Sequence, residues 1–390
     1  MQRPFIRPMP GRDITESHRP ATPLELFFDL VCVIAIASAA AGLHHAIAEN
    51  HIGIGILTFT YAFGSIWWAW MNFTWFASAY DNDDIPYRIA VFVMIGGAML
   101  IAAGIPAMMV DQDSTLGLTG YIIMRLALVS LWLRAGKHDP SRRTTAIRYA
   151  VGISMCQTLW IVGVLFVPAE FFFWFFPFAF ICEWAVPWYA EKAAGTPWHK
   201  GHIAERYGLL TIIVLGESLL ALSMAISASG EIGSWSFEQH MLILSGLIIV
   251  FSMWWLYFSE SEHLALDRTE SGFIGGYGHL VVFGSAAAVG AGLALNVDVL
   301  SGHAHVEGFI SNAALTIPSA LFLFGLWIVH DQFNHKKGFL RYLVLITALL
   351  LLGATYVPFA PAATALLLTG CLMVRLKQAS FIDDSHPTVS

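Results

Sequence analysis

Long apolar runs separated by short polar connections make up most of this chain. Twelve of these runs approach the length of a membrane-spanning helix, which needs roughly 20 residues at a rise of about 1.5 Å per residue. The runs cover residues 23–47, 53–78, 87–110, 116–135, 145–167, 170–190, 203–228, 239–259, 274–297, 307–329, 339–357 and 361–378. The pattern predicts an all-α polytopic membrane protein with about twelve transmembrane helices.

The composition supports this prediction. Of the 390 residues, 57% are hydrophobic and 12% are Asp, Glu, Lys or Arg, whereas soluble domains carry roughly 25% charged residues. Apolar side chains in such excess can face lipid, so the lipid bilayer is the expected partner. A net charge of −7 without any basic run argues against nucleic-acid binding.

The Lys and Arg residues indicate the orientation. With residues 1–20 in the cytoplasm, this tail, the even-numbered connections and the C-terminal end hold 19 of the 20 basic residues, and the odd-numbered connections hold none. The exception, Arg125, lies inside a span. Because short cytoplasmic loops are enriched in Lys and Arg, both termini are predicted to be cytoplasmic.

The two halves of the chain resemble each other weakly. Glu25 opens the first span and Glu205 the seventh, and tryptophan pairs recur at Trp67-Trp68 and Trp254-Trp255. With six spans in each half, both halves enter the membrane in the same sense, as in parallel repeats. We expect a tail at 1–20, six-helix halves at 21–195 and 196–378, and a cytoplasmic tail at 379–390.

The first span carries two acids. Ionisable groups inside spans cost roughly 2.5–3.5 kcal/mol each, so each needs an explanation. Thr22 and Glu25 have the spacing of a capping box, with Pro23 at the first helical position. Asp29 lies one turn deeper on the same face. The two acids could bind a cation or carry a proton; the alternatives are a cap for Glu25 and a structural partner such as Arg206 for Asp29.

The seventh span carries further ionisable groups. Glu217 lies near mid-membrane, where it could be a proton carrier, an ion ligand or a hydrogen-bonded structural acid. His199, His202 and Glu205 recur every three residues, a spacing that could form a metal-binding face. Histidines exposed at the membrane interface are commoner, so we expect no metal and no other cofactor.

Two charged residues occur in other spans. Arg125 could extend its side chain to the outer surface or pair with an acid. The candidate acids for that pair are Asp111, Asp113, Glu170 and Glu217. Glu183, in the sixth span, has no obvious partner in the sequence. Abundant aromatics, such as the run at 171–176, favour lipid-facing bulk over an aromatic substrate pocket.

Two segments resemble a known family. These are Thr22-Pro23-Leu24-Glu25-Leu26-Phe27-Phe28-Asp29-Leu30, and His202-Ile203-Ala204-Glu205-Arg206-Tyr207-Gly208 followed by Leu215-Gly216-Glu217-Ser218. They resemble the motifs of the bacterial low temperature requirement protein A family, and the resemblance covers roughly residues 18–378. It implies a multi-pass protein of the bacterial cytoplasmic (inner) membrane linked to growth at low temperature, but no molecular activity. It carries over Glu25, Asp29, His202, Glu205, Arg206 and Glu217.

Three classes of function remain open. Twelve spans, a repeat and acids in corresponding spans favour a secondary transporter or ion-coupled permease for a small molecule or ion, with Asp29 and Glu217 as coupling carboxylates and Arg125 as their charge partner. The second class is a non-transporting sensor or scaffold. The third is an intramembrane lipid-modifying enzyme that uses carboxylates with His199 or His202. A non-enzymatic role is favoured, since the ATPase, metalloprotease and hydrolase motifs GxxxxGK[ST], HExxH and GxSxG are missing.

Overall fold

The computed structural model describes residues 5–16, 19–228, 235–259, 269–304, 306–333 and 338–385, and within them the chain forms twelve α-helices and no strand. The helices are α1 (Pro23–Ala48), α2 (Ile52–Tyr80), α3 (Ile85–Val110), α4 (Thr115–His138), α5 (Arg143–Phe166), α6 (Ala169–Glu191), α7 (Lys200–Ala228), α8 (Phe237–Phe258), α9 (Thr269–Ser301), α10 (Gly308–Leu326), α11 (Leu343–Ala354) and α12 (Ala360–Ser385). A π-helical turn, Trp327–Asp331, continues α10, and a 3-10 turn, Gly338–Tyr342, precedes α11.

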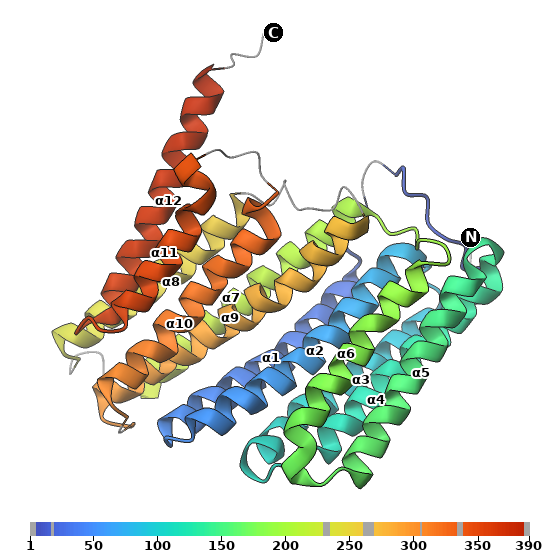
Figure 1. Cartoon of the computed structure of the whole chain (residues 1–390), viewed down its shortest axis with the longest axis horizontal. Helices are drawn as coiled ribbons and strands as arrows, with labels where there is room; N and C mark the ends of the chain where they lie inside the picture. The colour runs from blue at the N-terminus through green and yellow to red at the C-terminus, as the bar shows by residue number, and fades with distance from the viewer. Residues whose placement is uncertain are drawn as a thin grey trace. The chain divides into compact units, whose positions relative to one another are not determined.

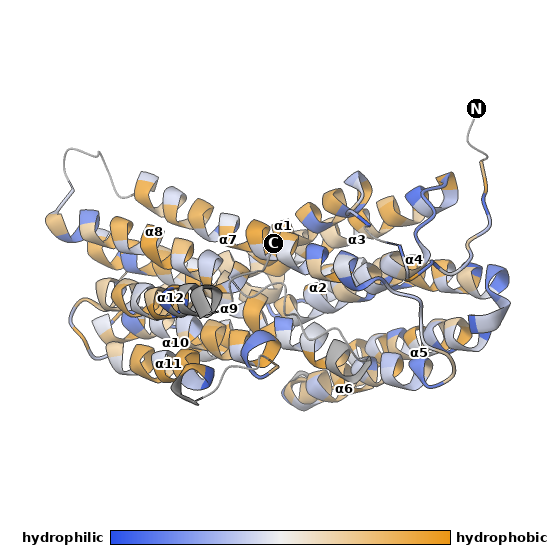
Figure 2. Cartoon of the chain, turned by 90° about the horizontal axis from the view of Figure 1, so that it is seen from above, coloured by the Kyte–Doolittle hydropathy of each residue, from blue (hydrophilic) through white to orange (hydrophobic). Residues whose placement is uncertain are grey.

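The helices match the apolar runs of the sequence closely. Within the described residues, eleven are long and apolar enough to cross a membrane, and the apolar stretch Leu340–Ala354, which contains α11, is shorter. Figure 2 shows hydrophobic residues over most of each helix and hydrophilic residues gathered towards helix ends. The prediction of an all-α membrane protein with about twelve helices is therefore confirmed.

Large apolar side chains also cover outward faces of the helices. Met155, Leu165, Phe166 and Trp174 are between 67% and 75% exposed. Soluble monomers rarely expose apolar patches of this kind, because water contact with apolar surface is unfavourable. A lipid environment removes that penalty.

The chain divides into two compact units, Met1–Ala39 with Thr60–Arg206, and Ala40–Phe59 with Tyr207–Ser390. In the first unit α3 packs on α4, α4 on α5 and α5 on α6, as Figure 1 shows. Tyr61 of α2 stacks on Phe176 of α6 with ring centroids 3.6 Å apart. This unit contains both candidate sites described below.

The second unit has a similar order of packing. Here α9 packs on α10, α10 on α11, α11 on α12 and α12 on α8. Asp331, at the end of the π-helical turn, forms a buried ion pair with Arg375 of α12.

Glycines allow close helix contacts in each unit. A Cβ atom added to Gly97 of α3 would lie 2.6 Å from the carbonyl oxygen of Gly120 on α4. In the second unit, a Cβ atom on Gly292 of α9 would overlap the backbone of Ala314 on α10. Such small residues bring helix backbones together, which increases their van der Waals packing.

Candidate functional site

The N-terminal parts of α1 and α7 bring the two sequence motifs together in one buried group of charged side chains, which Arg19 joins from the segment before α1. The group, here called the motif cluster, consists of Arg19, Glu25, Asp29, His202 and Arg206. None of the five side chains is more than 5% exposed. Two carboxylates therefore face two guanidinium groups and an imidazole away from water.

Glu25 caps its own helix, as the sequence predicts. Its backbone N–H donates to Thr22 Oγ1 at 3.3 Å, and the Thr22 N–H donates to Glu25 Oε2 at 2.8 Å. Glu25 Oε1 is also 3.2 Å from His202 Nε2, 3.2 Å from Arg206 Nη1 and 3.3 Å from Arg19 Nη2. The carboxylate thus ties α1 to α7 as well as closing the first turn of α1.

Asp29 has the structural partner that the sequence offered as an alternative. Arg206 donates from Nε to Asp29 Oδ2 at 3.0 Å and from Nη2 to Oδ1 at 2.5 Å. The indole N–H of Trp70 donates to the same Oδ1 at 2.6 Å, and Arg206 reaches Thr74 Oγ1 at 3.2 Å. Asp29 is therefore fixed by charge-assisted hydrogen bonds, which are shorter and stronger than neutral ones.

Asp81, which follows α2, lies at the edge of the motif cluster. Its Oδ2 is 3.5 Å from Arg19 Nη2, and its Oδ1 accepts the backbone N–H of Asp83 at 3.0 Å. Burial, together with the nearby negative charge of Glu25, raises the pKa of Asp81 to about 6. This carboxyl group can therefore change its charge in mildly acidic solution.

The remaining motif residues lie outside the cluster. Glu205 is half-buried in the first unit. Glu217 is half-buried in the second unit, and it has no hydrogen bond or ion pair with any described residue. His199 accepts the backbone N–H of His202 at Nδ1, and its Nε2 lies 2.9 Å from the carbonyl oxygen of Glu16. Among the described residues, no three His, Cys, Asp or Glu side chains are grouped as metal ligands.

A second group of buried polar and charged side chains surrounds Glu183 of α6. The Glu183 side chain is fully buried. Its carboxylate accepts five hydrogen bonds from three other helices, an arrangement here called the Glu183 network. The donors are Arg125 Nη2 at 2.8 Å, Trp68 Nε1 at 3.0 Å, Gln157 Nε2 at 3.0 Å, Tyr121 Oη at 3.1 Å and Trp160 Nε1 at 3.3 Å.

This network corrects the sequence prediction for Arg125. The guanidinium group is 1% exposed, so it does not reach the outer surface. Its partner is Glu183, which was not among the acids proposed for it. The sequence could not identify this pair because the two residues are 58 positions apart on helices α4 and α6, and their meeting depends on how these helices pack.

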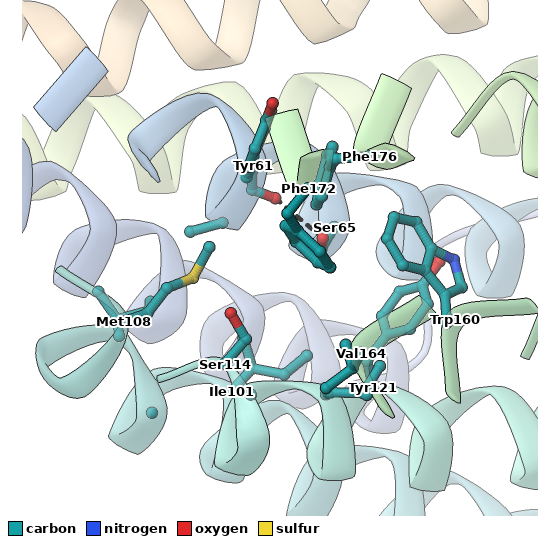
Figure 3. A pocket seen from close by; sticks show the side chains of 15 residues that line it. Tyr61, Ser65, Ile101, Met108, Ser114, Tyr121, Trp160, Val164, Phe172 and Phe176 are labelled. Atoms are coloured by element: carbon teal, nitrogen blue, oxygen red, sulfur yellow. Dashed lines mark hydrogen bonds between the residues drawn. The ribbon is translucent and has the colours of Figure 1, made fainter. Parts of the chain in front are cut away.

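An apolar pocket lies beside the Glu183 network, within the first unit. The space between its walls measures about 600 Å³ when the part open to the surroundings is counted, and its walls come from α2 to α6 and residue 114. Figure 3 shows Met108 and Trp160 on opposite sides of this space, with the indole nitrogen of Trp160 pointing away from it. Phe172 and Phe176 also line it. Part of the aromatic run at 171–176 therefore lines this pocket, whereas Phe171, Phe173 and Trp174 of the same run are exposed on the outer face of α6.

Two residues connect the pocket to the buried charge. Tyr121 and Trp160 line the apolar space, and both donate a hydrogen bond to Glu183. A molecule in the pocket would therefore touch two rings whose polar atoms bind a fully buried carboxylate.

Comparison with known proteins places the chain in a family. The family model for the bacterial low temperature requirement A protein matches residues 20–376. The chain belongs to this family. It is also similar to an uncharacterized protein of Rhizobium meliloti (strain 1021), with 26% identity over 390 aligned residues, 93% of this chain and 89% of the relative.

Several residues of the Glu183 network were not singled out in the sequence. The donors to Glu183 sit at helical spacing, since Tyr121 precedes Arg125 by four residues and Gln157 precedes Trp160 by three. Polar side chains at such spacing share one helix face. Such pairs inside an apolar span are a signal in the sequence that these residues lie beside a buried polar centre.

Proposed function

We propose that this member of the low temperature requirement A family is a secondary transporter, and that the pocket of the first unit receives a small apolar or aromatic molecule. One observation carries the proposal: Tyr121 and Trp160 are both walls of the pocket and hydrogen-bond donors to the buried Glu183 carboxylate. Ionisable residues inside spans commonly mark substrate or ion pathways, because they are costly to keep there.

The distribution of charge supports an outward-facing pocket. Met108, Ser114 and Phe172 line it near the connections at 111–114 and 167–168, which contain no Lys or Arg. From the positive-inside rule we infer that these connections lie outside the bacterial inner membrane and that both termini lie in the cytoplasm. In this orientation the motif cluster lies at the cytoplasmic end of the first unit.

Matching positions in the two units support an internal repeat. Gly292 follows Gly97 by 195 positions (292 − 97), and each glycine allows a close contact with the next helix along the chain. Trp327 follows Trp132 by the same interval (327 − 132). Repeats of this kind are common in transporters, where the halves move relative to each other.

The proposal assigns the coupling role to Glu183 with Arg125 as its charge partner. Asp29 is less suited to that role, because Arg206 and Trp70 hold its carboxylate. Glu217, which has no hydrogen bond to any described residue, is the second candidate for a coupling carboxylate.

Transport can be tested in liposomes that contain the purified protein and the pH dye pyranine. We would add small aromatic molecules of positive, neutral and negative charge, and measure their uptake and the pH inside. We expect uptake of at least one probe above that of protein-free liposomes. No uptake of any probe would refute the proposal.

A variant that fills the pocket gives a sharper test. Gly117 lines the pocket, and a Cβ atom at this position would meet no atom within 4 Å. Gly117→Phe should therefore block uptake without disturbing the fold. Gly96→Phe is the matched control, because Gly96 has equally free surroundings but does not line the pocket. Unchanged uptake by Gly117→Phe would exclude this pocket as the binding site.

A further inference from the structure

We propose that the first unit binds an anionic phospholipid at the end where α5 begins and α6 ends, which is the end inferred to be cytoplasmic. Basic side chains would hold the phosphate, and the acyl chains would lie on the apolar outer faces of the two helices. The site, here called the headgroup patch, consists of Arg143, Arg148, Trp188, Tyr189 and Lys192. The inference goes beyond the proposed transport function and does not depend on it.

The three basic side chains of the headgroup patch have no carboxylate partner. Arg143 donates from Nε to the carbonyl oxygen of Gly136 at 2.9 Å, and Arg148 donates from Nη1 to that of Tyr189 at 3.1 Å. Arg143 and Lys192 are exposed, and Arg148 is half-buried. None of the three forms an ion pair with a residue that the structure describes. Their remaining N–H groups can therefore donate to an anion.

Other arginines near this end of the first unit are paired with acids. The pairs are Arg88 with Asp83, Arg134 with Asp84, and Arg142 with Asp139. Glu191, which precedes Lys192, accepts hydrogen bonds from the Tyr149 hydroxyl and the Thr196 backbone N–H, both at 2.8 Å. Both of its oxygens are thus engaged by neutral donors, and the acid nearest to Lys192 in sequence makes no ion pair with the headgroup patch.

The position of Arg143 also favours an anion. Arg143 is the first residue of α5, and the first turn of this helix contains no acid. The N-terminal end of a helix carries a partial positive charge, which repels cations and attracts phosphate groups. A bound phosphate would compensate both the helix end and the guanidinium group of Arg143.

Two aromatic rings hold the other two cations against the end of α6. The guanidinium carbon of Arg148 lies 4.5 Å from the centre of the Tyr189 ring, and Lys192 Nζ lies 3.1 Å from that of Trp188. Both rings are exposed, and Trp and Tyr gather at the depth of the lipid head groups. Basic side chains at the cytoplasmic ends of spanning helices suit the phosphates of anionic lipids at this depth.

Apolar side chains continue the site along the outer faces of the two helices. Trp174, Phe178 and Ile181 of α6 and Val151 and Met155 of α5 are each more than half exposed. Such faces can receive acyl chains, which a soluble anion does not have. Cations beside apolar outer faces therefore fit a phospholipid better than free phosphate.

Native mass spectrometry can measure the lipid preference. We would add equal amounts of phosphatidylglycerol, which is anionic, and phosphatidylcholine, which has no net charge, to the purified protein. The protein should retain phosphatidylglycerol in preference. Arg148→Gln and Lys192→Gln should each lower this preference about fivefold, because one basic residue near anionic lipid contributes about 1 kcal/mol.

Two further variants act as controls. Arg88→Gln removes an exposed arginine near the same end of the unit, but this arginine is paired with Asp83 and lies outside the headgroup patch. It should leave the preference unchanged. Lys192→Arg keeps the charge and should also keep the preference. Equal retention of the two lipids by the unmodified protein, or an equal effect of Lys192→Gln and Arg88→Gln, would overturn the inference.

A measurement on the unmodified protein locates the lipid. Phosphatidylglycerol with a photoreactive group in its acyl chain should label the outer faces of α5 and α6, as peptide mapping would show. Unlabelled phosphatidylglycerol should compete with this labelling, whereas phosphatidylcholine and glycerol phosphate should not. Labelling confined to other helices would refute the site, and competition by glycerol phosphate as strong as that by phosphatidylglycerol would show a site for soluble anions instead.

Discussion

Arg206 holds Asp29 through two hydrogen bonds, although the two residues are 177 positions apart in the chain. Asp29 belongs to the first family motif and Arg206 to the second, so this pair joins the start of α1 to the start of α7. Both side chains are fully buried. The two motifs are therefore two parts of one structural element.

Arg206→Gln should destabilise the protein strongly. Removing one partner of a buried ion pair leaves an uncompensated charge and costs about 3–5 kcal/mol. A matching fall in melting temperature would be measured by size-exclusion chromatography after heating. The double variant Asp29→Asn with Arg206→Gln should recover part of the loss, because it leaves no unpaired charge on Asp29.

An exposed ion pair provides the control. The side chains of Arg88 and Asp83 are 49% and 34% exposed, so Arg88→Gln should cost less than about 1 kcal/mol. Equal effects of Arg206→Gln and Arg88→Gln would contradict the structural role of the motif cluster.

The close contact between α3 and α4 predicts a contrast between two neighbouring glycines. Gly97→Leu should lower stability by about 1–3 kcal/mol or more, because its side chain would collide with the backbone of Gly120. Gly96→Leu should have little effect, since a side chain there meets no atom within 4 Å. Thermal unfolding of both variants in the same detergent would test this, and a reversed order of stability would disprove the packing.

Asp81 should make stability depend on pH. Its pKa of about 6 in the folded protein lies above the usual Asp value, because burial and Glu25 disfavour its charge. The folded protein therefore binds the proton more tightly than the unfolded chain, and stability falls as pH rises from about 4 to 6. Unfolding curves across this range should show the fall for the unmodified protein and a smaller one for Asp81→Asn. An equal fall in both proteins would assign the effect to another group.

Glu217→Gln distinguishes the two candidate coupling carboxylates. Glu217 is half-buried and makes no hydrogen bond with a described residue, so the substitution should change stability by less than about 0.5 kcal/mol. Because the proposed coupling lies at Glu183, the uptake of small aromatic molecules and the accompanying change of internal pH should be unchanged in the liposome assay. Loss of the change of internal pH in this stable variant would move the coupling role to Glu217.

The helices could be predicted from the sequence because hydropathy is a local property. A run of apolar residues must form a helix in a bilayer, where each backbone group needs an internal hydrogen bond. A capping box is also a local feature, so the three-residue spacing of Thr22 and Glu25 was enough to predict it. Arg206 could also be named as a partner for Asp29, because an unpaired charge inside an apolar span is energetically unfavourable and the two residues carry opposite charges.

Only the tertiary structure decided which buried charges meet and where a cavity lies. The sequence placed Arg125 and Glu183 in spans but could not pair them, because their contact depends on how α4 packs near α6. The pocket was equally hidden, since its walls come from five helices and appear as ordinary apolar positions in each. Local patterns determine where a helix begins and ends, whereas contacts between distant helices arise from the packing of all of them together.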